Sequence, residues 1–305
     1  MPAYTIELIA PSGYPADAAR VARGVARLTA AGHVIVGGER ARRRCQRFGG
    51  TDAERLADLN ALGVADHAPA DLVLAVRGGY GLTRLLADVD YGNIARRLRA
   101  RGTRLVGHSD FTALQLALLA KTGLVTFSGP LLHADFGAEP LSRFTWDNCW
   151  RLLAAAESTC SWPSPSAPRL TVSGTLWGGN LTMLCSLLGT PFFPAIDGGI
   201  LFVEEVNEAP YRVERMLYQL HLAGVLGRQR ALLLGSFTGC RSTPADGGYD
   251  LAAALAQIAT VSGVPMIGGL PYGHVADKLT LPVGAPAELV SRDGQAGLRM
   301  ALLTD

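Results

Sequence analysis

A serine that could act as a nucleophile lies in the segment Gly107-His108-Ser109-Asp110. The segment joins a predicted strand at 104–106 to a predicted helix at 112–121. A serine at such a turn can expose its hydroxyl beside the N–H groups of the helix start, which can stabilise an oxyanion. The G-x-S-x-G elbow of α/β-hydrolases is not met, because Phe111 stands in place of its last glycine. Taken alone, the segment is also typical of an N-capping serine, which is the more common role.

A nucleophilic serine also needs a base, and its sequence neighbour is a poor one. The side chains of His108 and Ser109 diverge because the two residues are adjacent. His274 lies in a loop with a flanking glycine, where backbone can approach closely, and His133 follows an apparent strand at 125–132. Both histidines stay candidates. Three others fit packed or solvated roles: His33, His67 and His221.

An acid that could orient the base lies directly after the apolar run at 200–203. Glu204 and Glu205 follow it directly, and two carboxylates there are costly to bury without partners. Side chains alternate along a strand, so the two carboxylates are expected on opposite faces, and at most one serves a given site. Alternatively, both are charges that favour the dipole of a predicted helix at 212–222.

Two glycine-rich segments could contact a ligand. The segment 78–81 follows a predicted strand at 72–76, but no G-x-G-x-x-G or G-x-x-x-x-G-K-[ST] motif is present, so nucleotide binding has little support. Gly79 could instead donate its backbone N–H to an oxyanion. Trp177-Gly178-Gly179-Asn180 pairs an aromatic ring with an amide on what is expected to be a tight loop, which fits a substrate wall or an ordinary turn.

Strand and helix patterns alternate through the first half of the chain. A predicted strand at 6–10 precedes a helix at 16–31, and Thr51-x-x-Glu54 is a capping-box signature ahead of another helix. This alternation predicts a mostly parallel sheet with helices on both faces. Ligands of such sheets bind beyond the carboxyl ends of the strands, where the segments 78–81 and 107–110 are expected.

The composition changes after a predicted helix at 144–156. Residues 158–168 hold four serines and three prolines, which is typical of a linker. Beyond it, predicted strands at 200–203 and 232–234 suggest a strand-rich domain without regular βα alternation. The expected division is an α/β domain over 1–156, a linker over 157–170 and a β-rich domain over 171–305.

Composition excludes several classes of protein. The 305 residues are 49% hydrophobic, which excludes disorder for most of the chain, and 28 basic and 26 acidic side chains leave no field that would attract nucleic acid or an anionic membrane. Apolar stretches are too short for a membrane span, and the first residues are expected to form a strand rather than a secretory signal. The five cysteines are scattered, which predicts neither disulfides nor a zinc site, but a reduced, cytoplasmic protein.

The chain resembles the murein tetrapeptide LD-carboxypeptidases, which are serine peptidases with a Ser-Glu-His triad. The resemblance covers nearly the full length. The segments that carry it are 10–13 (APSG), 74–81 (LAVRGGYG), 107–113 (GHSDFTA), 127–130 (FSGP), 174–181 (GTLWGGNL), 204–208 (EEVNE) and 211–216 (YRVERM).

This resemblance implies a fold and a site. The fold is an N-terminal α/β domain like class I glutamine amidotransferases and a smaller, barrel-like, β-rich C-terminal domain, with the site in the cleft between them. Ser109 is implied as nucleophile, His274 as general base and acid, and Glu204 as its orienting carboxylate; Glu205 stands where relatives often have Asp. The backbone N–H groups of Gly79 and Asp110 would line the oxyanion hole. Four further residues are hypothesised to bind substrate: Tyr80, Trp177, Asn180 and Arg212.

The implied activity is removal of the terminal D-Ala from a murein tetrapeptide, after the L-centre of diaminopimelate, in peptidoglycan recycling. A cytoplasmic homodimer without metal or cofactor is implied as well. Two alternatives stay open: a microcin-immunity-type peptidase that cleaves a peptidyl-nucleotide, and a non-catalytic module that binds a sugar or nucleotide. A metallopeptidase is disfavoured, because the sequence has no H-E-x-x-H motif.

Overall fold

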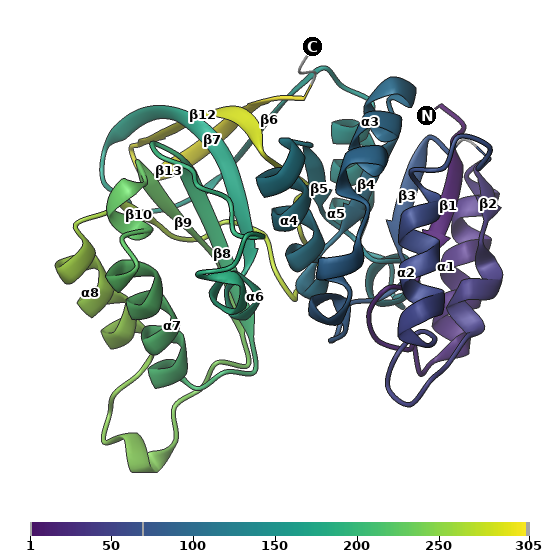
Figure 1. The fold of residues 1–305 in the computed structure, drawn as a ribbon. Helices are drawn as coiled ribbons and strands as arrows, with labels where there is room; N and C mark the ends of the chain where they lie inside the picture. Colours follow the sequence, from purple (N-terminus) through teal and green to yellow (C-terminus); the bar gives the residue numbers. More distant parts are fainter. Residues whose placement is uncertain (1, 69, 303–305) are drawn as a thin grey trace. The chain divides into compact units, whose positions relative to one another are not determined.

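The structure is a computed structural model that describes residues 2–68 and 70–302. Contacts divide the chain into two units. The first comprises Met1–Ala154 and Ala276–Val283, and the second comprises Ala155–Val275 and Gly284–Asp305. Each unit has its own β-sheet with helices packed against it (Figure 1).

The first unit contains a six-stranded sheet in the order β11-β5-β4-β3-β1-β2. Strands β1 to β5 pair in parallel, and β11 is antiparallel to β5. This confirms the predicted, mostly parallel sheet. The strands are β1 (Thr5–Ile9), β2 (Val34–Val36), β3 (Leu72–Ala75), β4 (Arg104–Gly107), β5 (Thr126–Ser128) and β11 (Leu281–Val283).

Helices flank this sheet in two groups. The helices are α1 (Ala18–Ala30), α2 (Asp52–Ala61), α3 (Tyr91–Arg101), α4 (Thr112–Thr122) and α5 (Arg143–Leu153). Helix α1 contacts a π-helical turn at Leu132–Phe136, whose Phe136 ring stacks on Trp150 of α5, while α3 packs against α4. Because both faces are covered, all four residues of β3 are buried. The predicted capping box is present, since the Thr51 and Glu54 side chains each bind the other residue's backbone N–H.

The second unit contains a seven-stranded sheet in the order β10-β9-β8-β7-β12-β13-β6. Strands β7 to β10 are parallel, and the other neighbours are antiparallel. The strands are β6 (Glu157–Pro163), β7 (Leu170–Asn180), β8 (Ile200–Val206), β9 (Ala231–Thr238), β10 (Met266–Ile267), β12 (Ala285–Arg292) and β13 (Gln295–Ala301). The helices are α6 (Leu181–Leu187), α7 (Pro210–Leu222) and α8 (Leu251–Ser262).

The order β7-α6-β8-α7-β9-α8-β10 is a regular βα alternation, so the prediction that this half lacks one was wrong. Helix α6 has only seven residues, and α8 is almost entirely apolar and small, so neither gives the polar and apolar stripes by which a surface helix is recognised.

Strand β6 differs from the predicted linker over 157–170. Residues Glu157–Pro163 pair with β13, and Trp162 is buried because alternate side chains of the strand face the core. The Trp162 indole and the Ser164 hydroxyl both donate to the Gly268 carbonyl, which directly follows β10. The two edge strands thus approach each other at this end, and the sheet curls as in a barrel.

A short return segment, Ala276–Val283, is fixed to the first unit by a buried ion pair. The Lys278 Nζ lies 2.6 Å from Asp135 Oδ1, and both side chains are at most 5% exposed. The Lys278 N–H donates to the Thr145 hydroxyl, and that hydroxyl donates to the Ala276 carbonyl. Polar contacts therefore hold the segment before it enters the sheet as β11.

We expect Lys278→Met to lower the free energy of unfolding by about 3–5 kcal/mol, because it leaves the Asp135 carboxylate buried without its cation. Urea denaturation followed by circular dichroism measures the change. The double variant Lys278→Met/Asp135→Leu should recover much of the loss, since it removes both charges. Arg143→Ala, which breaks an exposed pair with Asp147, is the control and should change stability by less than about 1 kcal/mol. Equal losses of stability in Lys278→Met and Arg143→Ala would contradict the stabilising role of the buried ion pair.

Candidate active site

Ser109 lies at a sharp turn between β4 and α4. Its φ is +65°, in the left-handed region that few residues other than glycine adopt, and a 3₁₀ turn at Ser109–Phe111 leads into the helix. A Cβ on Gly107 would lie 2.6 Å from the Phe111 ring, so this turn requires a glycine there. The N-cap alternative is not what the structure shows for either helical element: His108 precedes the 3₁₀ turn, and Phe111 precedes α4.

The loop after β3 lies directly against the Ser109 side chain. A Cβ on Gly78 would lie 2.7 Å from the Ser109 Cβ and 2.9 Å from its Oγ. Only a glycine lets the loop come this close. Gly79 follows with φ +103°, and it is exposed to solvent. The backbone N–H groups of Gly79 and Asp110 belong to the residues implied to line the oxyanion hole.

The residues on either side of Ser109 are buried and hydrogen-bonded. The His108 Nδ1 lies 3.0 Å from the Gly129 carbonyl, so this ring is held away from a role as base to its neighbour. The Asp110 carboxylate accepts from the Ser12 hydroxyl at 2.6 Å and from the Leu82 N–H at 3.0 Å. Burial raises the pKa of the Asp110 carboxyl above its ordinary value.

In the second unit, Glu204 on β8 holds His274. The Glu204 Oε2 lies 2.7 Å from the His274 Nδ1; the carboxylate is fully buried, and the imidazole is about a quarter exposed. Gly273 has φ +128°, and a Cβ there would lie 3.0 Å from the Glu204 side chain. With Nδ1 donating to the carboxylate, the neutral imidazole carries its lone pair on Nε2, which is the arrangement of a general base.

Glu205 lies on the same side of the strand as Glu204, which corrects the prediction from strict alternation. A bulge between Val203 and Glu205 shifts the register of β8 against β9. The Asn180 amide consequently donates to both carboxylates, at 3.1 Å to Glu204 and 3.0 Å to Glu205. Glu205 also accepts from the N–H and hydroxyl of Thr182 at the start of α6. The two carboxylates lie in a strand and do not begin helix α7.

Two residues expected to bind substrate have internal roles instead. Trp177 lies within β7 rather than in a loop; it is fully buried, and its indole donates to Gln229. A substrate wall needs an exposed ring, so we assign Trp177 to the core. Asn180 is 5% exposed, caps α6 through its Oδ1 and uses its Nδ2 on the two glutamates. Tyr80, by contrast, is 43% exposed beside Gly79.

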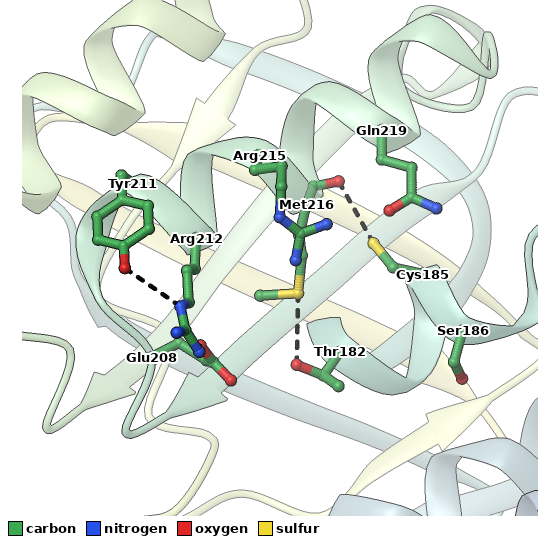
Figure 2. Close-up of a pocket in the computed structure, with 9 residues that line it drawn as sticks. All are labelled: Thr182, Cys185, Ser186, Glu208, Tyr211, Arg212, Arg215, Met216 and Gln219. Atoms are coloured by element: carbon green, nitrogen blue, oxygen red, sulfur yellow. Dashed lines mark hydrogen bonds and ion pairs between the residues drawn. The ribbon is translucent and has the colours of Figure 1, made fainter.

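Arg212 lines a pocket of about 580 Å³ between α6 and α7 (Figure 2). The Arg212 guanidinium is more than half exposed and lies 3.5 Å from the Glu208 carboxylate. Figure 2 shows the side chains of Arg212, Arg215 and Glu208 around this hollow. Thr182 also lines it and binds Glu205, so a short chain of hydrogen bonds through Glu205 and Asn180 links the pocket to Glu204.

His133, the other candidate base, lies in the π-helical turn and not after a strand, since β5 ends at Ser128. No carboxylate in the described part of the chain accepts a hydrogen bond from its ring, and burial lowers its pKa. Within residues 2–68 and 70–302, no group of three His, Cys, Asp or Glu side chains could hold a metal ion. Nor does any described helix have the length and hydrophobicity needed to cross a membrane.

The sequence analysis did not single out three side chains near these groups: Ser12 and Arg55 in the first unit and Thr182 in the second. Arg55 is fully buried and donates to the carbonyls of Pro11 and Gly81. Its spacing was informative, since it lies four residues before the buried Leu59 on the same face of α2. Ser12 lies in the segment 10–13 that carries the family resemblance, but no role was assigned to it, and nothing local to Thr182 distinguishes it from an ordinary capping residue.

A strand-to-helix serine, and a histidine held by a buried carboxylate, are components of hydrolases that form an acyl-enzyme. Models of the LD-carboxypeptidase N-terminal and C-terminal domains match residues 6–129 and 173–289. The chain belongs to the LD-carboxypeptidase family, which confirms the resemblance read from its motifs.

Three relatives illustrate the range of the family. The muramoyltetrapeptide carboxypeptidase structure from Oxalobacter formigenes is 41% identical and covers 99% of this chain and 100% of its own, with a TM-score of 0.90. The murein tetrapeptide carboxypeptidase of Pseudomonas aeruginosa is 35% identical over 81% of this chain and 80% of its own. The microcin C7 self-immunity protein MccF of Escherichia coli is 27% identical over 87% of this chain and 83% of its own.

We expect Glu204 and Glu205 to have different functions. Glu204→Gln removes the charge that orients His274 and should lower the kcat of the carboxypeptidase by roughly 10²- to 10⁴-fold. Glu205→Gln is the matched variant: it loses bonds to Thr182 and Asn180, so it should mainly lower thermal stability and keep kcat within about tenfold of the parent. Steady-state kinetics and thermal melts of both proteins check this, and a larger kcat loss in Glu205→Gln would reverse the assignment.

Proposed function

We propose that this protein removes the terminal D-Ala from murein tetrapeptides, cutting after the L-centre of diaminopimelate, with Ser109, His274 and Glu204 as the triad. The observation that carries the proposal is the Glu204–His274 pair at 2.7 Å in a chain whose Ser109 lies at a strand-to-helix turn. The names of the Pseudomonas and Oxalobacter relatives support the choice of substrate.

In the first half of the reaction, the Ser109 Oγ attacks the carbonyl carbon of the scissile peptide bond, and its proton passes to the His274 Nε2. The Glu204 carboxylate stabilises the imidazolium that forms. The carbonyl oxygen becomes an oxyanion that accepts from the N–H groups of Gly79 and Asp110. The C–N bond then breaks, His274 returns the proton to the leaving amine, and D-Ala departs, leaving an acyl ester on Ser109.

In the second half, water attacks the acyl carbon while His274 takes one of its protons. The C–O bond to Ser109 breaks, and the proton returns to the Ser109 oxygen. The products are the tripeptide, now with a free carboxylate, and D-Ala, and one water is consumed. No step needs a metal or cofactor, because the base and the oxyanion donors come from the protein.

The D-Ala carboxylate needs a cation, and we propose Arg212 for that role. Support comes from its exposed guanidinium and from its pocket, which is linked to Glu204 through Glu205. Asn180 is withdrawn from this role, because its amide is occupied within the protein. Tyr80 is proposed as a second substrate contact, since its exposed ring adjoins Gly79.

Location and assembly are part of the proposal. We place the enzyme in the cytoplasm as a homodimer, as the family resemblance implies. All five cysteines are free, which fits a reducing compartment. Light scattering of the purified protein measures the oligomeric state, and a monomer at micromolar concentration would contradict the dimer.

A peptidyl-nucleotide substrate is the second candidate, favoured only by the similarity to MccF. We expect mass spectrometry to show loss of one alanine from diaminopimelate tetrapeptide and no hydrolysis of an aspartyl sulfamoyl adenosine probe. Ser109→Ala should lower kcat roughly 10⁴-fold or more with an unchanged melting temperature, because it removes the nucleophile but no packing. Retained turnover in this variant, or cleavage of the nucleotide probe alone, would overturn the proposal.

For Arg212, we expect Arg212→Ala to raise KM for the tetrapeptide roughly 10- to 100-fold with kcat little changed, because a charge-assisted hydrogen bond to a carboxylate contributes about 1.5–3 kcal/mol. Arg241→Ala removes an exposed arginine outside the pocket and should leave KM unchanged. A wild-type KM in Arg212→Ala would reject this contact.

A further inference from the structure

We propose that the Asp110 side chain is a positioning residue: it holds the loop that carries Gly79 at a fixed place beside Ser109, so that one buried carboxylate aligns both oxyanion donors. The inference rests on the proposed function, because it assumes that the Gly79 and Asp110 N–H groups stabilise an oxyanion. It assigns a role to a side chain that otherwise has none in the reaction.

The Asp110 carboxylate connects three loops at one edge of the first sheet. Asp110 follows β4 and is 1% exposed. Its Oδ2 accepts from the hydroxyl of Ser12, in the loop after β1, at 2.6 Å, and from the N–H of Leu82, in the loop after β3, at 3.0 Å. Strands β1, β3 and β4 are neighbours in the sheet, so their carboxyl ends lie at the same edge.

Direct contacts prevent the loop that carries Gly79 from moving closer to Ser109. The Gly13 N–H donates to the Gly78 carbonyl at 3.0 Å, and the Gly78 backbone leaves no room for a Cβ beside Ser109. The loop therefore cannot move closer to Ser109. Asp110 prevents it from moving away, because its bond to Leu82 holds the loop three residues after Gly79.

Arg55 completes this arrangement by binding the backbone of two of the three loops. Its guanidinium donates to the Pro11 carbonyl, in the loop after β1, and to the Gly81 carbonyl, in the loop after β3. Burial raises the pKa of Asp110, whereas the Ser12 hydroxyl, the N–H groups of Leu82 and Gly81 and the Arg55 charge act in the opposite direction. Each of these groups stabilises the ionised form of the carboxylate, while burial has the larger effect on its pKa.

Such a role has a specific kinetic signature. Oxyanion donors act when they lie within about 2.7–3.1 Å of the oxygen that becomes charged, and a displaced donor weakens the transition state more than the bound substrate. Loss of the Asp110 tether should therefore lower kcat and leave KM almost unchanged. A purely structural role would lower the melting temperature without lowering kcat at a nearly constant KM.

The experiment compares Asp110→Ala and Asp110→Asn with the parent enzyme below their melting temperatures. We expect Asp110→Ala to lower kcat about 10²- to 10³-fold, with KM within about threefold. Asp110→Asn should lose less, since the amide oxygen can still accept from Leu82. A peptide boronic acid that forms a tetrahedral adduct with Ser109 should lose affinity for Asp110→Ala in proportion to kcat/KM.

The matched control is Glu7→Gln, which changes another buried carboxylate of the same sheet. Glu7 lies in β1, pairs with Arg40 and His67, and takes no part in the three loops. It should destabilise the protein while keeping kcat. A kcat loss in Glu7→Gln equal to that in Asp110→Ala, or wild-type kcat in Asp110→Ala, would overturn the inference.

Failure of the inference can be told from failure of the proposed function. If Ser109→Ala is inactive and Asp110→Ala is fully active, only the positioning role is wrong. If Ser109→Ala stays active, or the parent releases no D-Ala from tetrapeptide, the proposed function fails whatever the Asp110 variants do.

Discussion

Backbone packed directly against a reactive side chain is the constraint on which the first unit's site depends. Cβ atoms on Gly78 and Gly107 would lie 2.7 Å from the Ser109 Cβ and 2.6 Å from the Phe111 ring. Neither distance is compatible with a side chain, so the serine turn and the loop beside it fit together only as glycine backbone. Phe111, which stands in place of the last glycine of the hydrolase elbow, lies against Gly107 from within the helix start.

Buried carboxylates in both units are stabilised by several specific partners rather than by solvent. Glu204 and Glu205 would repel each other in a dry strand, yet the Asn180 amide donates to both, and further donors are divided between them: His274 on Glu204, Thr182 on Glu205. The bulge in β8 makes this sharing possible, because regular alternation would have sent one carboxylate to the other face of the sheet. The bulge is therefore what allows one amide to bind both neighbouring carboxylates.

Hydrophobic pattern and capping chemistry predicted the alternating strands and helices of the first unit, since apolar segments such as β3 alternate with helices such as the capped α2. The same rules failed in the second unit for physical reasons. Helix α8 has no polar stripe, β6 carries Ser and Pro on its exposed positions, and Trp177 continues a strand through two glycines that resemble a turn. The β8 bulge and the Asp110 contacts arise from tertiary structure, so no local spacing could have revealed them.

Ser109, the proposed nucleophile, and His274, the proposed base, are held by residues at different distances along the chain. Ser109 is shaped largely by residues 107–111 and by the adjoining Gly78 loop, so its segment could be recognised from local sequence. The His274 Nδ1 is oriented by a carboxylate 70 residues away, and Gly273 and Gly235 only make room for that carboxylate. Contacts within the second unit therefore suffice to orient the imidazole of the proposed base, and contacts within the first suffice to shape the turn that carries the proposed oxyanion donors. In the proposed mechanism, substitutions around Glu204 should consequently act on proton transfer, and those around Asp110 on charge stabilisation.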